Sequence, residues 1–416
     1  MAEVTNYIDR LVAELCPDGV EYRPLGEIAD VTSGYVFPVK YQGNEKSAED
    51  NIPFYKVSDM NLPGNEMFMT SSNNYVSAES AEEMRASLAQ PESIIFPKIG
   101  AAIATNKKRI LTEKSIVDNN VMAVTARSVI NSKFLYYVLS GFDLMSWSMG
   151  AGAVPSIKKS VVVKHEVPVP PMEVQEAIVE ILDKFTNLEA ELEAELEART
   201  LQYEYYRDSL FEALDCPRVP LGSFARLVRG SGMPKTDFSE SGVGAIHYGQ
   251  IYTKFGTATA EVIAHVPEDK AKKLAVVNPG DVIVANTSEN LEDVCKAVAW
   301  VGESDIVTGG HATVIKAPEQ NAKFISYYMA TGQFNKDKRR HAFGTKVIDV
   351  APKNLAKIEF PVPSLEEQQR IVDILDRFDA LTSSLSEGLP AELTARRSQY
   401  EYYRDQLLSF PRKGDN

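Results

Sequence analysis

The chain contains one long segment twice, and this duplication constrains its fold more than any other feature of the sequence. Residues 166–185 are EVPVPPMEVQEAIVEILDKF and residues 359–378 are EFPVPSLEEQQRIVDILDRF, so 12 of 20 positions are identical. The heptapeptide QYEYYRD occurs at 202–208 and again, unchanged, at 399–405. A period near 195 residues is too long for a solenoid and therefore indicates a duplicated domain pair.

The two copies are not equally similar along their length. Residues 17–164 and 215–357 form two bodies that match each other only weakly, whereas the segments that follow them, 165–214 and 358–416, are alike. Divergent bodies suggest two different ligands, and the alike segments suggest a shared structural or partner-binding role. The sequence NYIDRLVAELCP near the N-terminus echoes YYRDSLFEALDCP at the end of the first alike segment. Residues 1–16 are therefore expected to form a helix that completes the second conserved region.

The alike segments have the apolar spacing of a coiled coil. Their apolar residues recur three and four positions apart, which places them along one stripe of a helix. Because the chain alternates body and helix, the two helices are expected to pack antiparallel on each other. Gly388 and Pro390 occur in the second segment only, where they predict a kink or break. The predicted seam residues are Ile178, Ile181, Phe185 and Leu188 in the first segment, and Ile371, Ile374, Phe378 and Leu381 in the second.

The bodies show the patterns of mixed α and β structure. Short apolar or β-branched runs such as SIIFPKI, DVIVAN and HATVIKA are bounded by Gly, Pro and Asn, as strands are. KFLYYVLSGFDLMSWS and KFISYYMATGQFNKDKRR have amphipathic helical spacing near the end of each body. We therefore expect an α+β protein in which two pseudo-repeat mixed α/β domains are separated by an antiparallel coiled coil of two long helices.

The net charge of −14 is unevenly distributed along the chain. The net charge of the whole chain argues against nucleic-acid binding, but the two bodies together carry +2, so this argument does not apply to them. Basic clusters recur in both bodies, and Lys158 and Lys346 follow the glycine-containing loops GAGAVPSIKK and FGTKVID, which suits approach to a phosphate. The net charges by segment are −2 for 1–16, −1 for 17–164, −10 for 165–214, +3 for 215–357 and −4 for 358–416.

The sequence has no recognisable catalytic or metal-binding motif. The dipeptide Gly-Lys does not occur, which excludes a P-loop, and the five histidines are dispersed without an HExxH pattern. Cys16, Cys216 and Cys295 are too few and too scattered for a disulfide framework or a zinc site. No run approaches 18 apolar residues, and the N-terminus lacks the apolar region of a signal peptide. We therefore expect a cytoplasmic, non-enzymatic protein without a membrane span.

The duplicated blocks PVPPMEVQEAIVEILD and PVPSLEEQQRIVDILD, each ending in YEYYRD, resemble the specificity subunit of type I restriction–modification systems. This resemblance implies that the bodies are target recognition domains, each reading one half of an asymmetric bipartite DNA site. It implies that the helix pair sets the spacer between the half-sites and docks two adenine methyltransferase subunits. Restriction–translocase subunits would join the full complex. S-adenosylmethionine, ATP and magnesium would bind those partners, and this chain would bind no cofactor or metal.

Residues for DNA contact are expected at loop tips and basic clusters of the two bodies, since Arg and Lys suit guanine and phosphate. Residues 188–198, LEAELEAELEA, repeat a four-residue unit that is suited to setting a spacer length. Two alternatives stay open: a pseudo-symmetric protein–protein scaffold without DNA readout, and a nuclease, for which Glu268-Asp269-Lys270 is a fragment of a motif. The predicted DNA-contact residues are Ser33, Gly34, Tyr35, Lys107, Lys108, Arg109 and Lys158 in the first body, and Arg229, Gly230, Ser231, Lys235, Arg339, Arg340 and Lys346 in the second.

Overall fold

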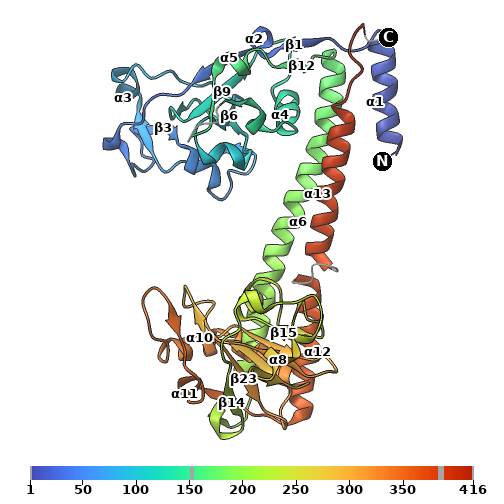
Figure 1. Cartoon of the computed structure of the whole chain (residues 1–416). Coiled ribbons are helices and arrows are strands. Elements are labelled where there is room, and N and C mark those ends of the chain that lie inside the picture. The colour runs from blue at the N-terminus through green and yellow to red at the C-terminus, as the bar shows by residue number, and fades with distance from the viewer. Residues whose placement is uncertain (1, 150–153, 383–387, 415–416) are drawn as a thin grey trace. The chain divides into compact units, whose positions relative to one another are not determined.

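The structure, a computed structural model, divides the chain into two compact units (Figure 1). Unit 1 is Met1–Ala190 with Ala395–Asn416, and unit 2 is Glu191–Thr394. Each unit contains one body, part of the long helix α6 (Met172–Glu212) and a second helix beside it. Both bodies combine helices with sheets, so the predicted α+β class is confirmed. The described residues are 2–149, 154–382 and 388–414.

The body of unit 1 is built on a five-stranded sheet whose strands are out of sequence order. The order is β2-β9-β6-β7-β4, and all neighbours are antiparallel except β4 and β7. Strand β6 reads IIFP and is buried at all four positions, as expected for a strand covered on both faces. A second sheet, β5-β3-β8, lies with α3 (Ala78–Glu83) toward the end of the body away from α6 (Figure 1). The strands are β2 (Ala29–Ser33), β3 (Asp50–Tyr55), β4 (Phe68–Met69), β5 (Tyr75–Ser77), β6 (Ile94–Pro97), β7 (Arg109–Leu111), β8 (Ile116–Val117) and β9 (Val121–Ala126).

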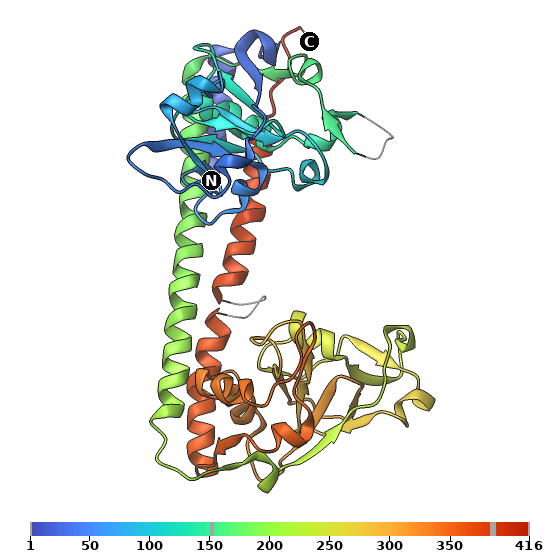
Figure 2. The ribbon, with the colours of Figure 1, turned by 90° about the vertical axis from the view of Figure 1, so that its left-hand side faces the viewer.

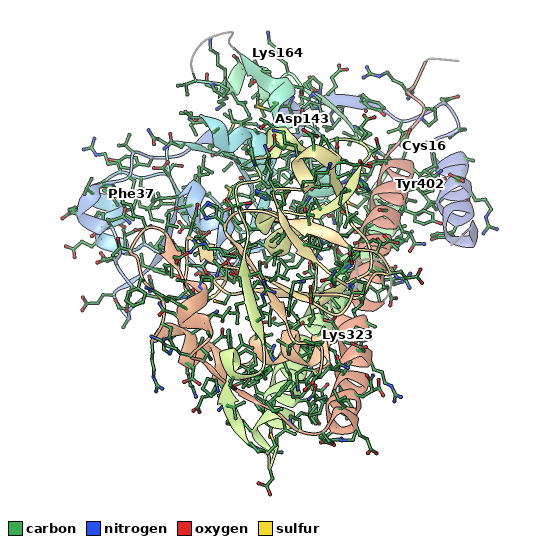
Figure 3. All side chains as sticks on the ribbon, turned by 60° about the horizontal axis from the view of Figure 1, so that its bottom comes forward. Cys16, Phe37, Asp143, Lys164, Lys323 and Tyr402 are labelled. Carbon is green, nitrogen blue, oxygen red and sulfur yellow. The ribbon has the colours of Figure 1, made fainter. Side chains whose placement is uncertain are left out.

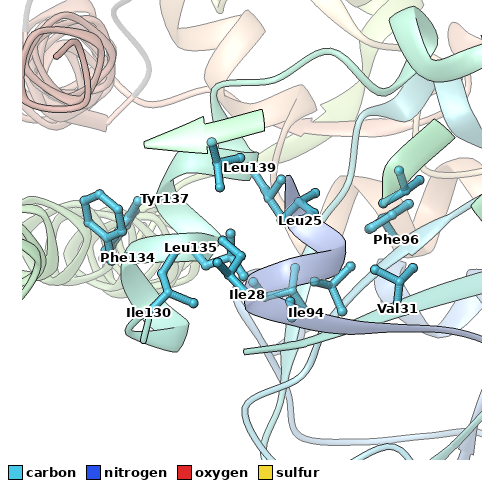
Figure 4. Close-up of a cluster of buried hydrophobic side chains, with 14 of the residues drawn as sticks. Leu25, Ile28, Val31, Ile94, Phe96, Ile130, Phe134, Leu135, Tyr137 and Leu139 are labelled. Atoms are coloured by element: carbon cyan, nitrogen blue, oxygen red, sulfur yellow. The ribbon is translucent and has the colours of Figure 1, made fainter. Parts of the chain in front are cut away.

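Helix α4 (Ser132–Ser140) joins this sheet to α6. It begins where the side chain of Asn131 accepts hydrogen bonds from the backbone N–H groups of Lys133 and Phe134, which is the usual role of Asn at a helix start. Its apolar side chains pack with those of β2, β6 and the short helix α2 (Leu25–Ile28) in one core (Figure 4). The chain enters and leaves the body through an antiparallel pair, β1 (Tyr22–Pro24) with β12 (Glu166–Pro168).

In unit 1, α6 runs antiparallel to α13 (Gly388–Leu407) (Figures 1 and 2). Phe185 stacks on Tyr403 with ring centroids 5.7 Å apart, while Glu189, one turn later, accepts a hydrogen bond from Arg397 at 2.7 Å. The partner number falls as the α6 number rises, so the predicted antiparallel pairing is confirmed. Helix α1 (Ala2–Leu15) packs beside the end of α13, where Ile8 shares a core with Leu407 and Phe410.

The predicted seam of α6 is wrong at two positions. Ile178 is fully buried with Val174 and Leu182 in the core of the body, and Leu188 is 48% exposed. Ile181 packs at the edge of the same core, and Phe185 alone of the four makes an aromatic contact with α13. The reason is that α6 buries one face against its body and a different face against a helix. A single heptad stripe therefore does not describe it.

The body of unit 2 repeats this architecture. Its five-stranded sheet has the order β14-β23-β19-β21-β16, and a four-stranded sheet has the order β17-β15-β22-β18. Strand β19, VIVA, is buried throughout and takes the central place that β6 takes in unit 1. The strands are β14 (Arg226–Arg229), β15 (Val243–Ile246), β16 (Ala258–Thr259), β17 (Ala264–Val266), β18 (Ala275–Val277), β19 (Val282–Ala285), β21 (Ala297–Trp300), β22 (Ile306–Thr308) and β23 (Ala312–Lys316).

The helices of unit 2 follow the same plan as those of unit 1. Asn321 caps α9 (Ala322–Met329) as Asn131 caps α4, and β13 (Arg218–Pro220) pairs with β25 (Glu359–Pro361) at the base of the body. Helix α10 (Gly332–Arg339) follows α9 directly. Helix α12 (Leu365–Thr382) packs on α9. Gly388, at the start of α13, has φ 75°, a left-handed conformation that a continuous helix does not allow, which confirms the predicted break.

The predicted seam of α12 is also only partly correct. Phe378 stacks on Tyr206 of α6 with ring centroids 5.8 Å apart. Ile371 is fully buried in the core of the body, Ile374 is half-buried, and Leu381 is 39% exposed. The helix again divides its apolar residues between its body and its partner helix. Among the described residues, no helix is long and apolar enough to cross a membrane.

Candidate DNA interface

In both bodies the first long strand of the sheet ends at a glycine that crosses another backbone segment at close range. A Cβ on Gly34 would overlap the carbonyl oxygens of Val117 and Asp118, and a Cβ on Gly230 would overlap the carbonyl oxygen of Gly309. Close backbone packing therefore explains why both positions are glycine, and the predicted contact of Gly34 and Gly230 with DNA stays a prediction. The two glycines identify equivalent places in the two bodies.

Hydrogen bonds extend this equivalence to neighbouring loops. The N–H of Gly34 donates to Val121, and the N–H of Gly230 donates to Ala312, each at the start of the paired strand. The residues just before these strands are Asn120 and His311. The carbonyl of Asn120 accepts from the N–H of Lys98, and that of His311 accepts from the N–H of Asn286. Asn120 and His311 therefore occupy the same position in the two bodies.

A third equivalent pair follows the strands β3 and β15. Lys56 caps the 3-10 helix η2 (Val57–Asn61), and His247 caps α7 (Tyr248–Thr253). In each, the capping residue's N–H donates to the side chain three residues later, Asp59 in one body and Gln250 in the other. The same backbone design thus presents a lysine in the first body and a histidine in the second.

In unit 2 these equivalent positions line an open cleft of about 520 Å³. Tyr248 lies between two imidazoles, with its ring centroid 4.4 Å from that of His247 and 5.0 Å from that of His311. The guanidinium of Arg229, which is 50% exposed, lies at the rim, 3.7 Å from the carboxylate of Asp349. The lining residues are Arg229, Gly230, Gly232, Met233, Pro234, His247, Tyr248, Gly310 and His311.

The two histidines of the cleft are held in defined orientations. The Nδ1 of His247 accepts a hydrogen bond from the N–H of Gly249 at 3.1 Å. Burial, with a smaller effect of Lys235, lowers the pKa of His247, so the ring is neutral near pH 7 and carries its proton on Nε2. The Nδ1 of His311 lies 3.1 Å from the hydroxyl of Thr287. Within the described ranges, neither ring has a hydrogen-bond partner at Nε2, which leaves this edge for another group.

The remaining predicted residues of the second body lie on its surface. Lys235 and Lys346 are exposed, and Lys346 lies in a loop closed by backbone hydrogen bonds between Phe343 and Asp349. Ser231 is exposed and donates its hydroxyl to the carbonyl of Lys273 at 2.6 Å. Because Asp349 pairs with Arg229, the base of the Lys346 loop lies beside the cleft.

Arg339 and Arg340, at the end of α10, are exposed and form surface ion pairs. Arg339 lies 3.7 Å from Glu292, and Arg340 lies 3.2 Å from Asp337. Such pairs contribute little to stability and exchange readily for another anion. The adjacent Lys338 is instead buried, with its ammonium donating to two backbone carbonyls.

The cluster Lys107-Lys108-Arg109 in the first body does not form the loop tip that the sequence suggests. Lys107 donates to the side chain of Asn61, and Lys108 is buried with its ammonium donating to Asn106 and to the carbonyl of Phe142. Arg109 belongs to β7 and donates to two backbone carbonyls. These hydrogen bonds hold the side chains of Lys108 and Arg109 against the body, so we leave both residues out of the interface.

The equivalent position in unit 2 supports this correction. Lys296 follows Cys295 as Lys107 follows Asn106, and both Cys295 and Asn106 have a positive φ. The ammonium of Lys296 donates to the carbonyl of Tyr252 at 3.2 Å. Lys107 and Lys296 thus each hold the short helix that follows the capping residue. A lysine at this place is explained by the fold of either body.

Unit 1 has a second basic group, close to Ser33, Gly34 and Tyr35, that was not among the predicted residues. Three lysines there lie over aromatic rings, and Phe37 marks this region in Figure 3. The signal was the alternation of aromatic and basic residues in YVFPVKYQGNEK. The lysine–ring pairs are Lys40 with Tyr41 (4.7 Å), Lys46 with Tyr75 (5.7 Å) and Lys56 with Phe37 (4.6 Å).

The predicted residue Lys158 is exposed at the start of the short helix α5 (Lys159–Val162), and residues 150–153 ahead of it lie outside the described residues.

The junction between body and helix is the same in both units, down to individual atoms. In unit 1 the carboxylate of Asp183 accepts from the hydroxyl of Tyr137 at 2.7 Å and from the ammonium of Lys133 at 2.6 Å. In unit 2, Asp376 accepts from Tyr327 and from Lys323, both at 2.7 Å, and Lys323 is labelled in Figure 3.

A glutamine in each helix completes this junction. The side-chain oxygen of Gln175 accepts from the N–H of Asn131 at 2.7 Å, and that of Gln368 accepts from the N–H of Asn321 at 2.9 Å. Both glutamines are buried. The alike segments of the sequence therefore contain the residues that fix each body to its helix. No group of three or more His, Cys, Asp or Glu side chains suited to a metal occurs in the described part of the chain.

The sequence matches one protein family twice. The family described as "Type I restriction modification DNA specificity domain" matches residues 17–198 and again residues 219–395. The chain belongs to this family. The two matches correspond to the two bodies with their helices, and both bodies are target recognition domains of the type I specificity subunit.

Curated specificity subunits are similar in sequence to this chain, one over almost its whole length and another over little more than half of it. A putative type I restriction enzyme specificity subunit of Haemophilus influenzae is 26% identical over 403 residues, which cover 94% of this chain and 96% of that protein. The EcoR124I/EcoR124II specificity subunit of Escherichia coli is 36% identical over 252 residues, which cover 58% of this chain and 60% of that protein.

Solved structures show the same fold at low identity. A structure described as "Structural basis underlying complex assembly and conformational transition of the type I R-M system" has a TM-score of 0.59 and 16% identity, covering 96% of this chain and 98% of that chain. The S subunit of a type I restriction–modification system from M. genitalium has a TM-score of 0.51 and 13% identity, covering 94% of this chain and 96% of that one.

Proposed function

We propose that this chain is the non-catalytic subunit that gives a type I restriction–modification complex its DNA sequence specificity. Each body reads one half of an asymmetric bipartite site in double-stranded DNA. Two adenine methyltransferase subunits dock on the helices, and restriction–translocase subunits join them in the full complex. The complex acts in the cytoplasm, where its DNA is found.

The observation that carries this proposal is the contrast between two regions of each body, the helix junction and the candidate DNA interface. At the helix junction the equivalent residues are identical, as in Asp183 with Asp376 and Gln175 with Gln368. At the candidate DNA interface the equivalent residues differ: Ser33 with Arg229, Lys56 with His247, and Asn120 with His311. Two copies of one scaffold with different reading surfaces suit two different half-sites, whereas identical junctions suit identical partners.

The exposed aromatic residues of the helices support docking of two like partners. In the two copies of QYEYYRD, the residues Tyr205 and Tyr402 occupy the same position and are 70% and 59% exposed (Figure 3 labels Tyr402). Tyrosine is enriched at protein interfaces because its ring is apolar and its hydroxyl can hydrogen-bond.

We assign S-adenosylmethionine, ATP and magnesium to the partners.

Methylome sequencing tests the proposal directly. The chain would be expressed with its cognate methyltransferase subunit in a host that lacks other adenine methylation. We expect a new bipartite methyladenine motif that disappears when this chain is omitted. The control is the same methyltransferase with a different specificity subunit, which shows that the enzyme is active. Absence of a motif with an active methyltransferase would refute DNA specificity and favour the protein–protein scaffold.

The helix α6 provides a second test, because we propose that its length sets the spacer. Residues 188–198 repeat a four-residue unit, and four helical residues rise about 6 Å. A base pair rises about 3.4 Å, so removal of one unit is expected to shorten the spacer of the motif by about one to two base pairs. Both half-sites should stay unchanged. A motif with the original spacer would contradict this role for the helix.

A further inference from the structure

We propose that the His–Tyr–His cleft of unit 2, with Arg229 at its rim, is the place where the second body reads the base edges of its half-site. The inference rests on the proposed function and adds the residues that determine one half of the specificity. The cleft is lined by Tyr248 between His247 and His311, in the geometry described above.

The chemistry of the lining suits base edges in a DNA groove. Arg229 presents a guanidinium that can donate two parallel hydrogen bonds to the O6 and N7 atoms of guanine. In the free protein Arg229 forms a long surface ion pair with the Asp349 carboxylate, at 3.7 Å. DNA can replace this ion pair at little cost in free energy. His247 and His311 use their Nδ1 atoms within the protein, at 3.1 Å each, and this leaves Nε2 of each ring for a base.

Charge and shape around the cleft favour duplex DNA as the occupant. Lys235 next to Pro234, and Lys346 in the loop that ends at Asp349, are both exposed and can contact phosphates while the cleft contacts bases. Gly230, Gly232 and Gly310 have no side chains to keep a DNA strand away from the cleft wall. The lysines supply affinity that does not depend on sequence, and the cleft supplies discrimination.

The duplication provides test substitutions that the scaffold accommodates. Arg229→Ser and His311→Asn each place in unit 2 the residue that unit 1 has at the equivalent position, Ser33 and Asn120. His311 has φ 65°, and Asn is among the residues that tolerate this conformation best. The matched control is Lys357→Ala, which removes an exposed cation just before β25, near the helix junction.

The experiment measures methylation by the complete methyltransferase complex on duplexes in which each base pair of both half-sites is varied in turn. For Arg229→Ser and for His311→Asn we expect the preference for the original base pair over the other three to fall about tenfold at one or more positions of one half-site. This half-site should be the same for both variants. Discrimination in the other half-site should not change. Lys357→Ala should leave both half-sites as they are.

Three results would overturn the inference. Unchanged discrimination in both variants would exclude base reading by the cleft, and so would a uniform loss of affinity with an unchanged motif, which indicates phosphate contact only. Relaxation of both half-sites by variants that unfold at the original temperature would overturn it too, because the cleft would then not be specific to one half-site. If the unaltered complex methylates no bipartite motif, the proposed function itself fails, which is a different result from any of these.

Discussion

Substitution of Tyr327 by Phe tests whether the junction residues hold each body on its helix. The hydroxyl of Tyr327 donates to the carboxylate of Asp376 at 2.7 Å, and Lys323 donates to the other oxygen. Tyr327 is buried, and burial together with the neighbouring carboxylate raises the pKa of its hydroxyl, so the group remains a protonated donor. Tyr327→Phe removes this one hydrogen bond and leaves the ring in place.

The expected loss follows from the charge and exposure of the acceptor. A hydrogen bond to a charged group contributes about 1.5–3 kcal/mol. The Asp376 side chain is 37% exposed and keeps Lys323, so water and the ammonium compensate part of the loss. We therefore expect about 1.5 kcal/mol, near the lower limit, which corresponds to roughly a tenfold change in an opening equilibrium.

Hydrogen exchange of the full-length chain measures this locally. In Tyr327→Phe the amides of α9 should exchange about tenfold faster and those of α4 at the original rate. The unit 1 counterpart, Tyr137→Phe, should give the reverse pattern, since Tyr137 makes the same bond to Asp183 at 2.7 Å. Tyr205→Phe, at an exposed tyrosine, is the matched control and should change neither helix.

The reasoning fails if Tyr327→Phe leaves exchange in α9 within twofold of the original. It also fails if either substitution accelerates α4 and α9 equally, because the two junctions would then not act separately. A double-mutant cycle with Asp376→Asn distinguishes the direct bond from general loosening. The two substitutions should be clearly non-additive.

Three further predictions concern stability. Gly34→Ala should lower the free energy of unfolding by about 3 kcal/mol because its Cβ would overlap backbone carbonyls, whereas Gly232→Ala, with no atom within 4 Å, should stay within about 0.5 kcal/mol in chemical denaturation. Gln368→Leu should destabilise by about 2 kcal/mol, since the N–H of Asn321 loses its buried acceptor; an unchanged melting temperature would contradict this. Burial lowers the pKa of Lys108 to about 8, below that of an unfolded lysine, so the unfolded chain binds more protons above pH 8. The free energy of unfolding, relative to that of Lys108→Met, should therefore rise by about 1.6 kcal/mol from pH 8 to 9.5 in chemical denaturation, and parallel pH curves would contradict this.

Some residues of the candidate interface were predictable from the sequence and some were not. Arg229 and Gly230, which line the cleft of unit 2, were among the predicted residues because a strand that ends in a glycine-containing turn is visible in the sequence itself. Lys107 and Lys108 were misplaced because a basic run has the same appearance whether its side chains extend into solvent or fold back onto the body. Only the tertiary structure shows that Lys108, in the loop just before β7, points into the body, where Asn106 and the carbonyl of Phe142 replace water around its ammonium. His247 and His311 are 64 residues apart in the chain, so their meeting across Tyr248 depends on strand pairing.

The sequence by itself determined the architecture of this protein: two bodies, two helical regions, an antiparallel helix pair and a break at Gly388. Such features depend on periodicity and on local backbone preference, which a linear sequence records. Only the tertiary structure decided how the apolar residues of α6 and α12 divide between body and partner helix, because one helix can bury two faces and the spacing does not say against what. It likewise decided which cations remain in water, because the solvation of a side chain depends on neighbours from distant parts of the chain.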